Sequence, residues 1–129
     1  MAKRILVVED ELKQQAVIRK RLESGGYLTF GAADGVEGLE LAKSEKPDLI
    51  VLDLKLPRKS GYEICRELKR DPEYRQIPIL MLTAMDQETD VGRGKALGAD
   101  CYVRKPFDGK LLLAQVAELL ARVEQEVIR

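Results

Sequence analysis

Five short apolar runs recur along the chain, and segments with helical periodicity separate them. The runs are Ile5–Val8, Tyr27–Ala33, Leu49–Leu52, Ile77–Leu82 and Cys101–Val103. They consist mainly of β-branched and aliphatic residues without polar alternation, which is typical of strands buried on both faces of a sheet. Strands that alternate with helix-length segments predict βαβ units and a parallel sheet.

The first helix is expected to follow Asp10, whose side chain can cap it, and to end at about Ser24, before two glycines. Its apolar positions are Leu12, Ala16 and Leu22. The pattern therefore predicts that the first apolar run leads directly into a helix that begins with an acidic residue.

Four more helices are expected between and after the remaining runs. Asp34 precedes the second helix, which ends before Pro47. The others are predicted at Tyr62 to about Arg70, at about Asp86 to Leu97, and from Phe107–Asp108 to the C-terminus. The chain is thus predicted to form one (βα)5 domain, residues 1–129, with a doubly wound, five-stranded parallel sheet and no linker or repeat.

Composition and charge narrow the possible functions. The 129 residues include 22 Lys+Arg and 22 Asp+Glu, and this zero net charge argues against direct binding to nucleic acid or to an anionic membrane surface. The absence of histidine excludes Ser-His-Asp triads, histidine zinc sites and phosphohistidine on this chain. Any histidine chemistry must therefore come from a partner.

The cysteines and the N-terminus suggest a cytoplasmic protein. Cys65 and Cys101 are far apart and form no CxxC motif, which indicates two buried thiols in a reducing compartment, with a disulfide between them as the alternative. Only four strongly apolar residues follow the basic N-terminus before Glu9, too few for a signal peptide or a membrane span.

Polar residues that could bind a ligand or take part in a reaction lie at the ends of four of the predicted strands. Glu9 and Asp10 follow the first run, Asp53 the third and Thr83 the fourth, and Lys105 lies just past the fifth. The carboxyl ends of parallel strands meet at one edge of the sheet, where ligands bind in open α/β folds. These five side chains are therefore expected to converge.

Three converging carboxylates repel one another, by about 4 kcal/mol per pair at 4 Å and an effective dielectric near 20. A hard divalent cation such as Mg2+ would relieve this repulsion, because it binds carboxylates, a backbone carbonyl and water. A lysine and a threonine hydroxyl beside the cation suit the oxygens of a transferring phosphoryl group. Asp53 is then the candidate nucleophile.

Each residue taken singly also has a purely structural interpretation. Asp10 and Thr83 could be helix caps, and Asp53 could start a turn that ends at Pro57. Glu9 could be a solvated loop carboxylate. The remaining two alternatives are a solvated charge for Lys105 and a half-buried aromatic ring with its hydroxyl in water for Tyr102. Five independent coincidences at strand ends are improbable, so the joint pattern favours a phosphoryl acceptor.

The same residues resemble the receiver domain of two-component response regulators, of the chemotaxis-protein type, over essentially the whole chain. The matching motifs are Val-Val-Glu9-Asp10, Leu-Asp53-Leu-Lys-Leu-Pro57-Arg-Lys-Ser-Gly61, Met-Leu-Thr83-Ala84 and Gly-Ala-Asp-Cys-Tyr102-Val-Arg-Lys105-Pro106-Phe107. The resemblance implies a flavodoxin-like strand order, 2-1-3-4-5. It also implies a cis peptide bond between Lys105 and Pro106.

The resemblance further implies a role for each site residue. Asp53 would accept a phosphoryl group from a sensor histidine kinase or a histidine phosphotransfer protein. Mg2+ would be held by Asp10, Asp53 and the backbone carbonyl of Lys55, with Glu9 reaching it through water. Lys105 would contact the phosphoryl oxygens. The residues that would move in response are Thr83 and the switch residue Tyr102.

The implied output is a change in the face formed by the fourth helix, fifth strand and fifth helix. That face could contact an output domain, a target protein or a second copy of the chain. The protein would not be an enzyme beyond catalysing its own phosphoryl transfer and autodephosphorylation. The alternatives are an aspartate-nucleophile phosphatase, which Lys55 disfavours because that family has a second acidic residue two positions after the nucleophile, and a receiver-like scaffold that is never phosphorylated.

Overall fold

Five parallel strands form the central sheet, in the order β2-β1-β3-β4-β5. The computed structural model describes residues 2–84 and 98–128. The strands are β1 (Arg4–Val8), β2 (Leu28–Ala32), β3 (Leu49–Asp53), β4 (Ile79–Ala84) and β5 (Cys101–Lys105). The predicted doubly wound, flavodoxin-like topology is confirmed, whereas the helix predicted at about Asp86 to Leu97 lies outside the described residues.

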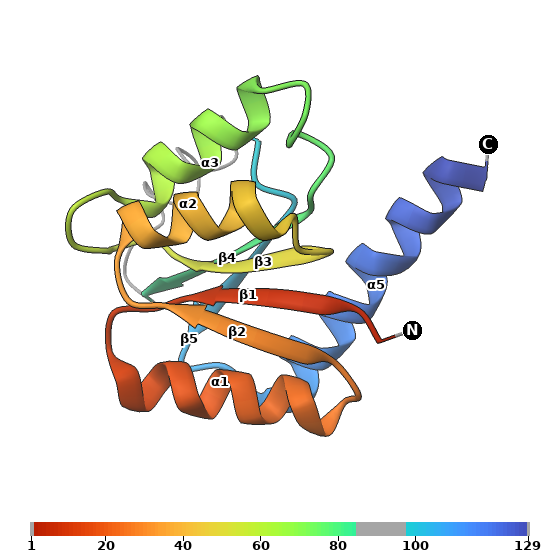
Figure 1. The fold of residues 1–129 in the computed structure, drawn as a ribbon. Helices are drawn as coiled ribbons and strands as arrows, with labels where there is room; N and C mark the ends of the chain where they lie inside the picture. The colour runs from red at the N-terminus through yellow and green to blue at the C-terminus, as the bar shows by residue number, and fades with distance from the viewer. Residues whose placement is uncertain (1, 85–97, 129) are drawn as a thin grey trace.

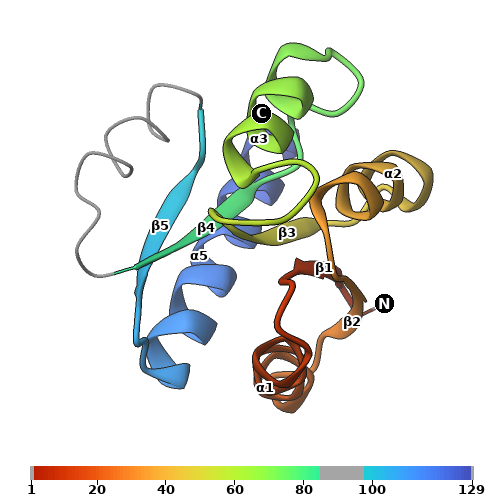
Figure 2. The same ribbon diagram turned by 90° about the vertical axis from the view of Figure 1, so that its left-hand side faces the viewer.

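Helices cover both faces of the sheet. They are α1 (Leu12–Ser24), α2 (Gly35–Glu45), α3 (Gly61–Arg70) and α5 (Gly109–Ile128). Helices α1 and α5 pack on one face, and α2 and α3 pack on the other (Figures 1 and 2). Because successive strand residues point to opposite faces, Ile5 and Val7 lie in the core beneath α1 and α5, and Leu6 and Val8 lie in the core beneath α2 and α3.

Strand β2 departs from the prediction that every strand is buried on both faces. Only Ala32 is buried, and the side chain of Leu28 at the start of the strand is exposed. The reason is topological, since β2 lies at an edge of the sheet and pairs only with β1. An apolar run is therefore compatible with an edge strand that is only half covered.

The buried face of α1 also differs from the prediction. The buried residues are Gln15, Ile18 and Leu22, whereas Leu12 is 67% exposed and Ala16 is exposed as well. The expected capping role of Asp10 is wrong, because the residue before the helix is Glu11, which makes no side-chain capping bond. The polar Gln15 thus takes a core position that a search for apolar residues passes over.

The later helix starts agree with the sequence pattern. The Asp34 side chain accepts a hydrogen bond from the Glu37 amide at 2.9 Å and caps α2 as expected. Helix α3 begins at Gly61, where a Cβ atom would lie 2.4 Å from the backbone oxygen of Asp53. Only glycine therefore lets the start of α3 approach the end of β3 so closely.

Neither cysteine forms a disulfide, and only one of the two thiols is buried as predicted. Cys65 is on the buried face of α3, where burial raises the pKa of its thiol to about 11. Cys101 is half-buried because β5 lies at the other edge of the sheet. Among the helices described, none is both long enough and apolar enough to cross a bilayer.

Candidate phosphoryl-acceptor site

Three carboxylates from two neighbouring strands meet at the carboxyl edge of the sheet. Glu9 and Asp10 follow β1, and Asp53 is the last residue of β3, which pairs with β1. One oxygen of each carboxylate lies within 4.8 Å of the others. The predicted convergence of these residues is therefore present in the structure. All three donors are oxygens, the ligand type that Mg2+ prefers, so the cluster fits a magnesium ion.

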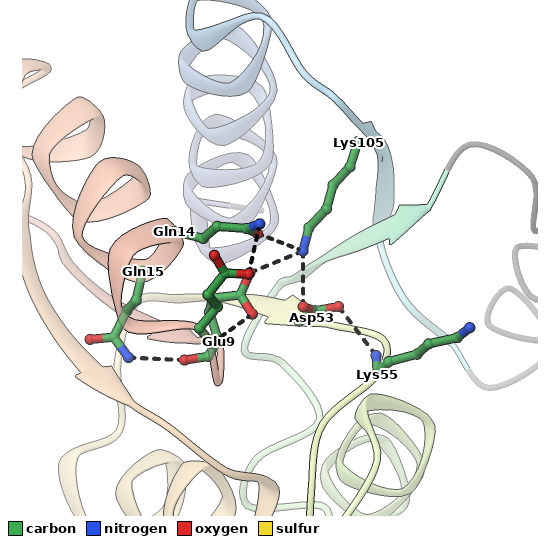
Figure 3. A network of polar contacts seen from close by, with 7 residues as sticks. Glu9, Gln14, Gln15, Asp53, Lys55 and Lys105 are labelled. Carbon is green, nitrogen blue, oxygen red and sulfur yellow. Dashed lines mark hydrogen bonds and ion pairs between the residues drawn. The ribbon is translucent and has the colours of Figure 1, made fainter.

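Lys105 joins this cluster from the end of β5. Its Nζ lies 2.9 Å from Asp53 Oδ2 and 2.9 Å from Glu9 Oε1 (Figure 3). It also donates to Gln14 Oε1 at 3.2 Å. The ammonium group therefore bridges two of the three carboxylates and partly neutralises their charge.

The close packing of these groups changes their acidity. Burial and the adjacent Asp53 raise the pKa of Glu9 from its ordinary value of 4.5 to about 7, despite the opposite effect of Lys105. Burial alone would lower the pKa of Lys105, but its hydrogen bonds to Asp53 and Glu9 outweigh burial and raise it. Lys105 is thus held in its charged form beside two groups that would otherwise repel each other.

Asp53 is held by backbone groups around it. Its Oδ1 accepts a hydrogen bond from the Lys55 amide at 3.2 Å, so Asp53 also begins a turn, as one structural alternative proposed. The Leu54 amide donates to the Leu82 carbonyl at 3.1 Å, which ties the turn to β4. A cleft of about 450 Å3 reaches one of the three carboxylates, Asp10, and its other lining residues are Leu54, Lys55, Leu56, Pro57, Ser60 and Tyr62. The cleft leaves space for a reacting group beside Asp10.

Thr83 and Tyr102 lie on adjacent strands and share an unusual property. The hydroxyl oxygens of both side chains are buried and have no hydrogen-bond partner among the described residues. In the register of β4 and β5, Met81 pairs with Tyr102 and Thr83 with Arg104, so the Thr83 and Tyr102 side chains point to the same face of the sheet. Burial raises the pKa of Tyr102, which keeps its hydroxyl neutral.

Several structural alternatives from the sequence are wrong. The Glu9 side chain is not a solvated loop carboxylate, because Glu9 is only 1% exposed. Lys105 is ion-paired rather than solvated, and the Tyr102 hydroxyl is buried rather than in water. A capping role of Thr83 would involve the helix predicted at 86–97, which lies outside the described residues. The Lys105–Pro106 peptide bond is cis, as the resemblance implied.

Two glutamines near the site were not predicted. Gln14 contacts Lys105 directly, and Gln15 donates hydrogen bonds to the backbone oxygens of Glu9 and Ala32. A polar residue three positions before Ile18 and seven before Leu22 was the available signal, because this spacing places it on the buried face of a helix.

Comparison with known proteins agrees with this arrangement. The family model of the response regulator receiver domain matches residues 5–117. The alkaline phosphatase synthesis transcriptional regulatory protein PhoP of Bacillus subtilis is 46% identical over 96% of this chain and 51% of its own length. The chain thus spans about half the length of the curated relatives it matches.

Solved structures show the same fold. The signal receiver domain of a histidine kinase from Syntrophus aciditrophicus has a TM-score of 0.89 and 37% identity, over 95% of this chain and 92% of its own. The receiver domain of sensor histidine kinase PA1611 from Pseudomonas aeruginosa has a TM-score of 0.86 and 31% identity, over 94% of this chain and 99% of its own, and its structure holds magnesium in the active-site cleft. With its strand order, its strand-end carboxylates and its sequence motifs all in agreement, this chain belongs to the response regulator receiver domain family, whose members are signalling modules.

Proposed function

We propose that Asp53 accepts a phosphoryl group from a phosphohistidine on a sensor histidine kinase or a histidine phosphotransfer protein. The observation that carries this proposal is the position of Lys105 Nζ, 2.9 Å from both Asp53 Oδ2 and Glu9 Oε1. A buried carboxylate beside a fixed ammonium group is suited to hold the charge of three phosphoryl oxygens. The donor histidine must belong to a partner, because this chain contains none.

Mg2+ is the cofactor that the donor set favours. Asp10, Asp53 and the Lys55 carbonyl would bind it directly, and Glu9 would reach it through water. The three carboxylates supply the hard oxygen ligands that Mg2+ requires. When bound, the ion would neutralise negative charge on the carboxylates and on the incoming phosphoryl group.

The transfer itself requires few groups from this chain. A carboxylate oxygen of Asp53 attacks phosphorus, a P–O bond forms, and the P–N bond to the partner's imidazole breaks. Lys105 stays beside Asp53 and donates hydrogen bonds to the transferred oxygens. Because Lys105 lies on β5 and Asp53 on β3, the site depends on the sheet from its middle strand to its β5 edge.

We propose that Thr83 and Tyr102 convert this event into a change of conformation. The Thr83 hydroxyl has no hydrogen-bond partner among the described residues, so a phosphoryl oxygen within its reach would provide one. A ligand shifts an equilibrium only through contacts that differ between two states, and this contact would exist only after phosphorylation. Tyr102, on the same face of the sheet, would follow Thr83 and act as the switch residue.

The expected output surface contains β5, α5 and the helix predicted at 86–97. We propose that it contacts an output domain, a target protein or a second copy of this chain. PhoP of Bacillus subtilis is described as a transcriptional regulatory protein, which favours a transcriptional output domain as partner. The balanced charge of this chain favours protein contact over direct contact with nucleic acid.

A small acyl phosphate tests the acceptor directly. With Mg2+ present, the chain should gain about 80 Da, and peptide mapping should place the added group on Asp53. Asp53→Asn should abolish the gain. Asp34→Asn is the matched control, because asparagine caps a helix as well as aspartate does and this carboxylate also follows a strand. Undiminished modification of Asp53→Asn, or full modification in the presence of a chelator, would contradict the assignment.

A further inference from the structure

The buried face of α1 contains one polar side chain, Gln15, which is 8% exposed. Its Nε2 donates to the Glu9 carbonyl at 3.1 Å and to the Ala32 carbonyl at 3.0 Å. The first of these bonds is visible in Figure 3. A primary amide has two N–H donors, so one side chain satisfies both carbonyls and joins the end of β1 to the end of β2.

The turn that Gln15 holds connects β1 to α1 and carries the acidic pair. Glu11, the residue before the helix, makes no side-chain capping bond, and its amide lies 3.4 Å from Glu9 Oε2. The Glu9 amide donates to the Ala32 carbonyl at 3.0 Å, so this carbonyl accepts hydrogen bonds from Glu9 and from Gln15. The side-chain amide of Gln15 therefore supports a turn that has no side-chain helix cap.

The side-chain amide of Gln15 packs against Gly31 of β2. A Cβ atom built on Gly31 would lie 2.0 Å from Gln15 Oε1. Any larger residue at this position would displace the end of the Gln15 side chain. Gln15 and Gly31 thus form a matched pair, with the glycine providing the space that the glutamine occupies.

The bond to Glu9 acts on the peptide group that links Glu9 to Asp10. Fixing that carbonyl fixes the plane of the peptide and hence the direction in which both side chains leave the backbone. Both carboxylates belong to the cluster with Asp53, and Glu9 is also bonded to Lys105. A change at Gln15 would therefore reach the site through the backbone.

We propose that Gln15 is a positioning residue that orients the Glu9–Asp10 carboxylates for a divalent cation. This inference rests on the proposed magnesium site and identifies the side chain that orders it. Groups that orient metal ligands from outside the coordination sphere commonly change metal affinity by 10-fold to 100-fold when they are removed. Gln15 would act in this way through its hydrogen bond to the Glu9 carbonyl.

Gln15→Met tests the role, because methionine keeps the length of the side chain and removes both donors. Its Mg2+ dissociation constant, measured by amide NMR titration, should rise about 10-fold. In the metal-free protein, the Asp10 amide 15N resonance should also move, because the preceding carbonyl has lost a hydrogen bond. Ile18→Ala is the matched control, since it removes core contacts from the same face of α1. It should lower the thermal midpoint while leaving Mg2+ affinity within 2-fold of the parent chain and the Asp10 resonance unchanged.

Gly31→Ala provides a second test that leaves Gln15 in the sequence. The added methyl group meets the end of a flexible side chain, so the protein should fold with the Gln15 amide displaced and Mg2+ affinity reduced. The double variant should bind Mg2+ no more weakly than Gln15→Met alone, because both changes break the same contact. If Gln15→Met does not fold, Gly31→Ala alone decides.

The outcomes separate this inference from the proposed function. If the parent chain binds Mg2+ and the dissociation constants of both variants lie within 2-fold of the parent value, the positioning role is overturned and the acceptor function stands. If the parent chain does not bind Mg2+, the proposed magnesium site itself fails, and the positioning role fails with it.

Discussion

The fold strongly changes the protonation of Glu9. Its folded pKa of about 7 lies above its ordinary value of 4.5, so between these values the folded chain binds more protons than the unfolded chain. The free energy of unfolding of the metal-free protein should therefore fall as pH rises through this window, by an amount on the order of 2 kcal/mol. Denaturant titrations in chelator at several pH values measure this change.

The control for this prediction is Glu9→Gln, which has a similar shape and no titrating group. Its stability should change much less between pH 4.5 and 7 than that of the parent chain. Equal pH dependence in both proteins would mean that other groups cause the effect.

Lys105 is expected to affect signalling more than metal binding. Lys105→Ala removes the ammonium group from Glu9 and Asp53 without removing a metal ligand, so the Mg2+ dissociation constant should stay within about 3-fold of the parent value. The response of Tyr102 to beryllium fluoride, a phosphoryl mimic, should weaken in NMR spectra. The exposed Lys110→Ala serves as control and should change neither quantity. Equal loss of metal binding and response in Lys105→Ala would indicate a structural role.

Thr83 offers an isosteric test of the proposed switch. Thr83→Val replaces a buried hydroxyl that lacks a partner among the described residues, so stability should rise by up to about 1 kcal/mol. Thr29→Val should not stabilise, because the Thr29 hydroxyl accepts a hydrogen bond from Arg19 at 3.0 Å. Mass spectrometry should still show phosphorylation of Thr83→Val, while NMR should show no response of Tyr102. A normal Tyr102 response in this variant would contradict the coupling.

Among the helices and strands that the structure describes, α5 extends furthest from the core. Its 20 residues span about 30 Å, against about 17 Å for a five-residue strand. The buried residues Leu112, Val116, Leu119 and Leu120 all lie in its first twelve positions, while Val123 is only half-buried. Figure 1 shows the C-terminal turns of the helix standing clear of the sheet.

This overhang provides a test of self-association. If β5 and α5 form the contact between two copies, light scattering should show a higher average mass with beryllium fluoride and Mg2+ than without them. A chain truncated after Arg122 should remain monomeric under both conditions. A monomer in every case would mean that the last turns of α5 are a helix end without a binding role.

Some helices and strands could be predicted from the sequence more fully than others. The strands and their carboxyl-end residues were predictable, because buried parallel strands are continuously apolar and the polar residues that end them stand out. The buried face of α1 was not predictable, because the polar Gln15 is buried while the apolar Leu12 is exposed. The Gln15 side chain donates a hydrogen bond to the Ala32 carbonyl, 17 positions away, and no local sequence pattern indicates such a contact.

The strand order suggests how a signal would spread through the whole molecule. Strands β4 and β5, which carry Thr83 and Tyr102, lie at the opposite side of the sheet from β2. Binding of beryllium fluoride with Mg2+ should therefore change hydrogen exchange most in peptides that cover Ile79–Ala84 and Cys101–Lys105. Peptides that cover β2 and α2 are the internal control. Equal protection everywhere would indicate general stabilisation without a directed change.

The distance along the chain between the site residues has a consequence for biosynthesis. Glu9 and Lys105 are bonded although 96 positions separate them, and Asp53 and Lys105 are 52 positions apart. Contacts of such long range form late, because a large loop must close first. A ribosome exposes the carboxylates well before it exposes the lysine that neutralises them. A nascent or proteolysed chain without β5 would therefore carry Asp53 without the Lys105 ammonium group, and if Asp53 is the acceptor as proposed, we expect such a chain to accept a phosphoryl group less well than the finished one.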